Sequence, residues 1–243
     1  VRMSPRLIRR AVDAMSGYVP GEQPREPGIV KLNTNENPYP PAPAVARALR
    51  EATADVLRLY PDPASTRLCE RIAEIHGARP EQVFIANGSD EILALCARAF
   101  VERDGAAGWF EPSYSLYPVL AQIEGIGCRP VDLGPDFEWR DPVACGASLF
   151  YLTNPNAPTG MLHPEDAVRA FCARFPGVVL IDEAYVDFAP RSLMDLALSS
   201  DRVLVARTLS KSHSLAGPRL GYAVGPAPLV GAMMKIKDSY NVD

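Results

Sequence analysis

The sequence predicts an α/β fold in which a largely parallel sheet is covered by helices. Two observations support this prediction. Short apolar runs alternate with helical patterns along residues 81–225, and two of these runs, "GVVLID" and "RVLVART", are almost continuously apolar. Continuous apolar runs are typical of strands buried on both faces of a parallel sheet. The alternation is the pattern expected of strand–helix–strand units.

Each element can be assigned in chain order. Strands are expected at "EQVFIA", "GWF", "CRPVDL", "SLFYLT", "GVVLID", "RVLVART" and "RLGYAVG". A helix over 89–102 is expected to start with Ser89 as its N-cap, and one over 164–175 with Pro164 at its first position. Further helices are predicted over 115–125 and from 227 to the end of the chain. The first 60 residues are rich in Pro, Asn and Gly and predict an extended arm.

Composition excludes several classes of protein. The chain has 243 residues, a net charge of -4 and no concentrated basic run, which argues against binding to nucleic acid or to a membrane surface. No apolar run reaches the roughly 18 residues of a membrane helix. The five cysteines are widely spaced and form no CxxC pair. This pattern indicates reduced cysteines in a cytoplasmic protein.

Common catalytic motifs are missing as well. The strand that ends at Asp182 resembles a magnesium-binding segment of nucleotide hydrolases, but no GxxxxGK[ST] loop precedes it. No GxGxxG follows a strand and no GxSxG is present. The three histidines have no ligand spacing, so no metal site is expected.

Polar residues gather where predicted strands end and helices begin, which is where α/β folds bind ligands. Gly88, Ser89 and Asp90 lie at such a junction, and the free N–H groups of Ser89 and Asp90 would hold an anion such as phosphate. A plain capped helix is the alternative. Asp182 ends a buried strand, and Lys211 and Arg219 follow it. For Lys211 alone, a solvated surface lysine is the alternative.

Together these residues suit pyridoxal 5'-phosphate. Lys211 would form the Schiff base, a role that needs an amine able to lose its proton. Asp182 would pair with the pyridine nitrogen and keep the ring an electron sink. Thr208, Ser210 and Arg219 would bind the phosphate, since a guanidinium offers a planar pair of donors.

The chain resembles the fold-type I pyridoxal-phosphate aminotransferases, and within them the histidinol-phosphate aminotransferase family. The segments that carry the resemblance are "YVPGEQP", "KLNTNENPYPP", "LYPDPASTRLCERIA", "NGSDEIL", "EPSYSLY", "NPNAPTG", "IDEAYVDF" and "TLSKSHSLAGPRLGY". They run from about Tyr18 to the C-terminus. The last three are specific for the superfamily, whereas "LNTNENPYPP" and "YPDP" narrow it to the histidinol-phosphate type.

The resemblance implies roles for individual residues. Lys211 carries the cofactor and moves protons, Asp182 contacts the ring nitrogen, and Tyr185 donates to the phenolic oxygen. Tyr114 stacks on the ring, although a core tyrosine is the alternative. The residues expected around the phosphate are Gly88, Ser89, Asp90, Thr208, Ser210, Arg219 and, from the neighbouring subunit of a homodimer, Tyr60. Tyr18 and Asn35 are candidate substrate contacts, with simple packing of the arm as the alternative.

One position departs from the family pattern. The family usually has asparagine directly before "PTG", where its amide meets the phenolic oxygen, but this chain has Ala157 there and Asn156 one residue earlier. Two alternatives follow: the turn shifts by one residue so that Asn156 fills the role, or Tyr185 acts alone.

The resemblance also implies a domain division. Residues 1–40 would form an N-terminal arm and part of a small domain, and residues 41–243 the large cofactor-binding domain. The chain is expected to stop inside the helix that leads to a C-terminal small domain, which would be largely absent.

The function implied is transfer of an amino group between L-histidinol phosphate and 2-oxoglutarate, in histidine biosynthesis. Another aminotransferase or a threonine-phosphate decarboxylase could share every cofactor residue. A non-catalytic domain of a transcriptional regulator that senses the cofactor is the alternative from another class. It would need a helix-turn-helix segment, and nothing before Tyr18 is long or basic enough to form one.

Overall fold

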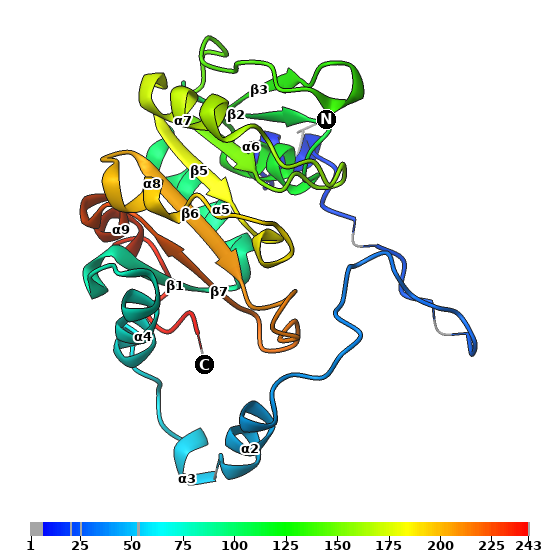
Figure 1. The fold of residues 1–243 in the computed structure, drawn as a ribbon, viewed down its shortest axis with the longest axis vertical. Helices are drawn as coiled ribbons and strands as arrows, with labels where there is room; N and C mark the ends of the chain where they lie inside the picture. The colour runs from blue at the N-terminus through cyan, green and yellow to red at the C-terminus, as the bar shows by residue number, and fades with distance from the viewer. Residues whose placement is uncertain (1–6, 20, 25, 53, 243) are drawn as a thin grey trace, which may run out of the picture.

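The chain forms a seven-stranded sheet with helices on both faces, as the computed structural model shows for residues 7–19, 21–24, 26–52 and 54–242 (Figure 1). The strand order is β1-β7-β6-β5-β4-β2-β3. The strands are β1 Val83–Asn87, β2 Ala106–Glu111, β3 Gly127–Asp132, β4 Leu149–Thr153, β5 Val178–Asp182, β6 Val203–Thr208 and β7 Leu220–Val224. The predicted α/β fold is therefore confirmed.

All neighbouring strands from β6 to β3 pair in parallel, whereas β7 runs antiparallel to both β6 and β1. Consequently β1, β2, β4, β5 and β6 end at one edge of the sheet, and β7 begins there. The register places Asp182 beside Thr153 and beside Ala206. The direction of β7 brings Arg219, which precedes it, to the same edge as Asp182.

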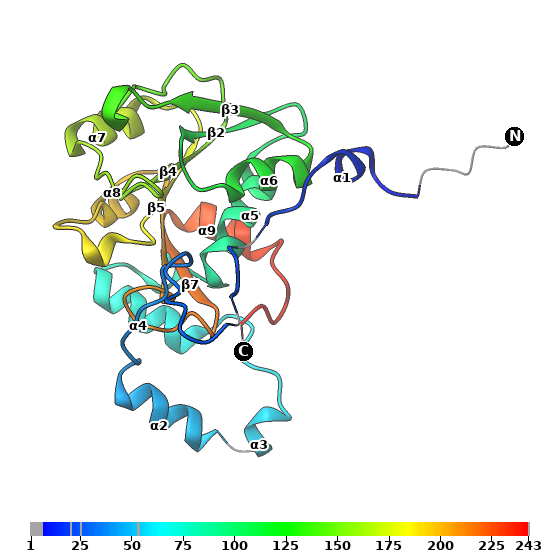
Figure 2. The same ribbon diagram turned by 90° about the vertical axis from the view of Figure 1, so that its right-hand side faces the viewer.

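The helices cover both faces of the sheet (Figure 2). Side chains alternate along β5, so that Ile181 belongs to the apolar core under α4, α7 and α8, and Leu180 to the core under α5, α6 and α9. The α-helices are α1 Arg10–Ala14, α2 Pro43–Glu51, α3 Ala54–Leu57, α4 Thr66–His76, α5 Gly88–Phe100, α6 Leu116–Glu124, α7 Glu165–Arg174, α8 Met194–Ser199 and α9 Ala227–Met234. The described residues also form three short 3-10 helices: η1 Pro80–Gln82, η2 Pro135–Phe137 and η3 Val186–Phe188.

The prediction of an extended arm over the first 60 residues is only partly met. The stretch between α1 and α2 has no regular secondary structure where it is described, but α1, α2 and α3 also lie within these residues and were not predicted. In both views α2 and α3 stand apart from the sheet (Figures 1 and 2). Before α2, Asn37 contacts Lys211 and Ser212 in the loop that follows β6. Several apolar side chains of this region are exposed, among them Leu57 at 76% and Tyr60 at 80%. None of the helices in the described ranges is long and apolar enough to cross a membrane.

Three helix boundaries differ from the predicted ones. The helix α5 begins at Gly88 with Asn87 as its N-cap, so the prediction of Ser89 as the cap is wrong. Pro164 is the N-cap of α7 rather than its first residue. The last helix, α9, ends at Met234 and does not continue to the end of the chain. In each case the apolar periodicity located the helix, but the backbone geometry of the turn decided where it starts or stops.

Candidate active site

The site is a cavity of about 640 Å³ at the edge where the parallel strands end. This volume lies within the range typical of small-molecule sites. The cavity joins residues far apart in sequence. Of the predicted site residues, its lining includes Tyr18, Asn35, Ser89, Asp90, Tyr114, Asp182, Tyr185, Thr208, Ser210, Lys211 and Arg219. The structure therefore brings together most of the residues singled out in the sequence.

One end of the cavity is a cradle suited to an anion. Gly88 opens α5 with φ of +76°, a backbone conformation that residues with side chains rarely adopt. A Cβ at this position would lie 2.5 Å from Nη2 of Arg219. A side chain at Gly88 would therefore displace the Arg219 guanidinium from the cradle. The first N–H groups of α5 have no partner inside the helix and favour negative charge.

Two buried hydroxyls complete the cradle. Thr208 ends β6 and donates to Ser210 Oγ at 3.0 Å, while the Ser210 N–H donates back to Thr208 Oγ1 at 3.1 Å. The hydroxyl hydrogen of Ser210 is therefore free to donate to a ligand. Arg219 lies opposite, and its Nη2 is 3.5 Å from Asp90 Oδ2 with both side chains 45% exposed. A guanidinium held this loosely can turn to a phosphate.

Gly221 makes the close contact between β7 and the start of α5, and its replacement is a test of the cradle. A Cβ there would lie 2.6 Å from both Gly88 C and Ser89 N, which are backbone atoms that cannot move independently. We expect Gly221→Ala to lower the free energy of unfolding by about 1–3 kcal/mol and to weaken phosphate-ester binding.

Gly217→Ala is the matched control, because nothing lies within 4 Å of its Cβ position. It is expected to change stability by less than about 0.5 kcal/mol. Urea unfolding and titration with pyridoxine 5'-phosphate measure the two effects. Equal stability and affinity of both variants would show that the contact does not shape the cradle.

Asp182 also lines the cavity and is 3% exposed. Its Oδ1 accepts from the N–H of Ala184 at 3.1 Å, and its Oδ2 accepts from the hydroxyl of Tyr117 at 3.1 Å. Burial raises the pKa of Asp182 to about 6, although these two hydrogen bonds oppose the shift. A buried carboxylate with so few donors is suited to a cationic partner from a ligand.

Lys211 lines the same cavity and contacts the N-terminal arm. Its Nζ donates to the backbone oxygen of Thr34 at 2.8 Å and lies 5.6 Å from the centre of the Tyr185 ring. Asn35 donates from Nδ2 to the Tyr185 hydroxyl at 2.9 Å, so the hydroxyl hydrogen of Tyr185 remains available to another acceptor. The arm therefore partly closes the cavity over the lysine.

Two tyrosines form a side wall. The hydroxyl of Tyr114 donates to Asp90 Oδ1 at 3.3 Å, and burial raises the pKa of Tyr114 far above its usual range. Tyr18 packs edge-on against Tyr114, with ring centres 6.4 Å apart. Both rings border the cavity and can contact a flat ligand.

The expected shift of the "NPNAPTG" turn is not observed. Asn156 is 1% exposed and lies outside the cavity lining, where Ala157 and Pro158 take its place. Its Nδ2 donates to the oxygen of Pro112 and to Thr159 Oγ1, and its Oδ1 accepts from Ser113. Because both amide hydrogens are donated away from the cavity, one within the turn and one to the loop after β2, the placement predicted for Asn156 is wrong.

Tyr60 also lies outside this cavity. Its ring stacks on that of Tyr240 with centres 4.4 Å apart and an interplanar angle of 16°. Its predicted contact with a neighbouring subunit stays a prediction.

Several residues of the site were not singled out in the sequence. Tyr117 is fully buried, and its contact with Asp182 orients the carboxylate. The only available signal was its position three residues after Tyr114, on the same face of a helix start. Asn37 donates to the oxygens of Lys211 and Ser212 from more than 170 positions away. No local pattern indicates such a contact.

These residues fit pyridoxal 5'-phosphate. The cradle of α5, Gly88, Ser210 and Arg219 offers donors to a phosphate, and the buried carboxylate of Asp182 offers a partner to a ring cation. Lys211 supplies an amine in the same cavity. For the described part of the chain, no cluster of three or more histidine, cysteine, aspartate or glutamate residues could hold a metal ion.

Comparison with known proteins identifies the class to which this site belongs. The profile of the family described as "Aminotransferase class I and II" matches residues 27–243. The chain belongs to this family.

The similarity is more specific than the class. The chain is 44% identical over 238 residues to "Histidinol-phosphate aminotransferase" of Syntrophotalea carbinolica, covering 97% of this chain and 69% of the relative. It is 48% identical over 232 residues to "Histidinol-phosphate aminotransferase 2" of Thiobacillus denitrificans, covering 95% of this chain and 65% of the relative. The chain thus spans about two thirds of the length of these relatives. The resemblance seen in the motifs is confirmed.

Solved structures show the same architecture. Histidinol-phosphate aminotransferase of Sinorhizobium meliloti, solved in complex with pyridoxal-5'-phosphate, superimposes with a TM-score of 0.80 at 29% identity. The match covers 86% of this chain and 59% of that one. Aspartate aminotransferase of Thermus thermophilus gives a TM-score of 0.76 at 20% identity, covers 87% and 61% of the two chains, and supports the fold alone.

Proposed function

We propose that the protein carrying this chain is a pyridoxal-phosphate-dependent aminotransferase that acts on L-histidinol phosphate, with 2-oxoglutarate as the amino acceptor, in histidine biosynthesis. The observation that carries the proposal is the meeting of Lys211, Asp182 and the α5 cradle in one cavity. The identity of 44–48% to relatives named histidinol-phosphate aminotransferase supports the choice of substrate.

Pyridoxal 5'-phosphate, when bound, supplies an electron sink and a carbon that accepts the amino group. The residues of this chain hold and orient it. Arg219, Ser210 and Thr208, together with the N-terminus of α5, would bind the phosphate, with Ser89 and Asp90 contributing backbone N–H groups. Asp182, kept in place by Tyr117 and the Ala184 N–H, would hold a proton on the ring nitrogen.

Lys211 would anchor the cofactor and, when displaced by substrate, carry a proton to and from the substrate carbon. Tyr185 would donate to the phenolic oxygen, because Asn35 leaves its hydroxyl hydrogen free. Tyr114 would contact the ring face. Thr34 and Asn35, which lie across the cavity, would limit the access of water.

The proposal includes a homodimer in the cytoplasm, in which Tyr60 reaches the neighbouring site and Tyr18 and Asn35 contact substrate. Exposed apolar side chains around Tyr60, such as Leu57 and Leu59, support an interface here because isolated monomers rarely expose such clusters. The division into an arm over residues 1–40 and a large domain over 41–243 belongs to the same proposal.

A substrate panel tests the proposed function. The full-length protein with pyridoxal 5'-phosphate should form glutamate from 2-oxoglutarate when L-histidinol phosphate is the donor. We expect it to prefer this donor over L-phenylalanine and L-aspartate by at least about 100-fold in kcat/KM, because a site that pairs a buried phosphate ester rejects donors without one. Release of carbon dioxide from O-phospho-L-threonine, or no transfer from L-histidinol phosphate, would contradict the proposal.

A further inference from the structure

A second polar cluster lies beside the cavity, and the function proposed above makes no use of it. Its centre is Glu183, the residue after Asp182, which is 1% exposed. Its Oε1 accepts from the Leu193 N–H at 2.6 Å, and the Ser192 hydroxyl donates to Oε2 at 2.8 Å. Glu183 is thereby fixed to the start of α8.

Arg207 joins this carboxylate to the next strand. Its Nε and Nη2 lie 3.0 and 2.9 Å from Glu183 Oε2, and Nη2 also donates to Ser192 Oγ at 2.7 Å. The arginine side chain is only 15% exposed. Because Glu183 follows β5 and Arg207 lies on β6, the planar guanidinium links the ends of the two strands that precede Glu183 and the lysine loop.

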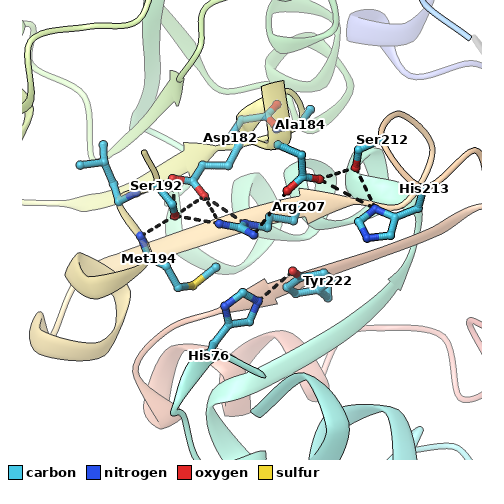
Figure 3. A network of polar contacts seen from close by, with 12 residues as sticks. His76, Asp182, Ala184, Ser192, Met194, Arg207, Ser212, His213 and Tyr222 are labelled. Atoms are coloured by element: carbon cyan, nitrogen blue, oxygen red, sulfur yellow. Dashed lines mark hydrogen bonds and ion pairs between the residues drawn. The ribbon is translucent and has the colours of Figure 1, made fainter. Parts of the chain in front are cut away.

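The remaining guanidinium nitrogen, Nη1, faces Asp187 at 3.9 Å. Asp187 accepts a hydrogen bond from the hydroxyl of Ser212, the residue directly after Lys211. The same loop is held from the other side by Asn37, which donates to the backbone oxygens of Lys211 and Ser212. A continuous chain of polar contacts therefore runs from Glu183 through Arg207 and Asp187 to the lysine loop. Figure 3 shows Arg207 within this network, with Ser192 on one side of it and Ser212 on the other.

We propose that Arg207 is a positioning residue for Lys211: through Asp187 and Ser212 it holds the lysine loop in the orientation from which the uncharged Nζ would condense with the aldehyde carbon of the cofactor, the aldehyde oxygen leaving as water. This proposal rests on the proposed function. Burying a charged pair costs desolvation, and apolar packing of similar volume would stabilise the fold at least as well. What an apolar pair would not provide is the fixed donor geometry that reaches both carboxylates.

The test separates attachment of the cofactor from its binding. Pyridoxal 5'-phosphate can bond to Lys211, whereas pyridoxine 5'-phosphate lacks the aldehyde and reports only on the cradle. Attachment is followed by visible absorbance and by borohydride trapping with peptide mapping. The variants are Arg207→Lys, Asp187→Ala and Ser212→Ala. Ser212→Thr restores the hydroxyl, and Arg98→Lys alters an ion pair with Glu124 on the other side of the sheet.

We expect Arg207→Lys, Asp187→Ala and Ser212→Ala to slow attachment about tenfold, because small misplacements of a reacting group cost rates of this order or more. Their affinity for pyridoxine 5'-phosphate should remain within about twofold of the parent. Ser212→Thr and Arg98→Lys should attach the cofactor at the parent rate. Asp187 and Ser212 are partly exposed, so their replacement by alanine should leave the protein folded. These two variants therefore test the proposal even if Arg207→Lys fails to fold.

Attachment at the parent rate in Ser212→Ala and Asp187→Ala would overturn the proposal and leave the cluster as packing. A parallel loss of affinity for pyridoxine 5'-phosphate in these variants would overturn it too, since the cluster would then shape the whole pocket. A parent protein that attaches no pyridoxal 5'-phosphate would instead contradict the proposed function itself.

Discussion

Lys211→Ala is expected to abolish covalent attachment of pyridoxal 5'-phosphate and to reduce transamination by roughly 10⁴-fold or more. The reason is that one amine serves both as the anchor and as the proton carrier, and general acid–base catalysis alone contributes up to about 10⁴-fold. The phosphate cradle is built from other residues, so pyridoxine 5'-phosphate should still bind with an affinity within about tenfold of the parent. Calorimetry and steady-state assays measure the two effects.

Lys235→Ala is the matched control, because this lysine follows α9 and is absent from the cavity lining. It should attach the cofactor and turn over like the parent. Substantial activity of Lys211→Ala would show that another group carries the proton and that the central assignment is wrong.

Asp182→Asn is expected to make the cofactor-free protein more stable while disabling the enzyme. Burial raises the pKa of Asp182 from 3.8 to about 6, so the folded chain binds this proton more tightly than the unfolded chain. The carboxyl therefore costs stability progressively as pH rises from about 4 to 6, and the cost is fully present above that range. A shift of this size corresponds to about 3 kcal/mol.

Because the ionised carboxylate lowers the stability of the parent as pH rises, the difference in unfolding free energy between variant and parent should depend on pH. Asp182→Asn should be the more stable protein in urea at neutral pH, and its advantage should widen by about 1–1.5 kcal/mol between pH 5 and pH 7.5. Activity should fall about 10²–10³-fold, because the ring nitrogen loses its charged partner. Pyridoxal 5'-phosphate should also stabilise the parent more than the variant. If the difference in unfolding free energy between variant and parent does not change with pH, burial does not raise the pKa of Asp182.

Much of this site can be predicted from the sequence, because the apolar runs indicate where the strands end. Apolar runs locate β5 and β6, and parallel strands place their carboxyl ends at one edge, so Asp182 and Thr208 must lie close together. Lys211 follows within three residues. The antiparallel direction of β7 cannot be read from an apolar run, although it is what brings Arg219 to the cradle.

The features of the site that the sequence does not predict are side-chain orientations and contacts between residues far apart in the chain. The amide of Asn156 joins its own turn to the loop after β2, because Thr159 and Pro112 accept its two amide hydrogens. A sequence pattern does not determine this side-chain rotamer. Tyr117 on Asp182 and Arg207 on Glu183 each join separate elements of the fold. Asn37 reaches the lysine loop only because the extended arm crosses the sheet edge.

The most direct test of the central claim is borohydride reduction of the protein in pyridoxal 5'-phosphate, followed by peptide mapping. The site predicts a single labelled peptide, modified at Lys211, with the label prevented by Lys211→Ala. A label on Lys235 or Lys237, or on no peptide, would contradict the assignment of this cavity as the cofactor site.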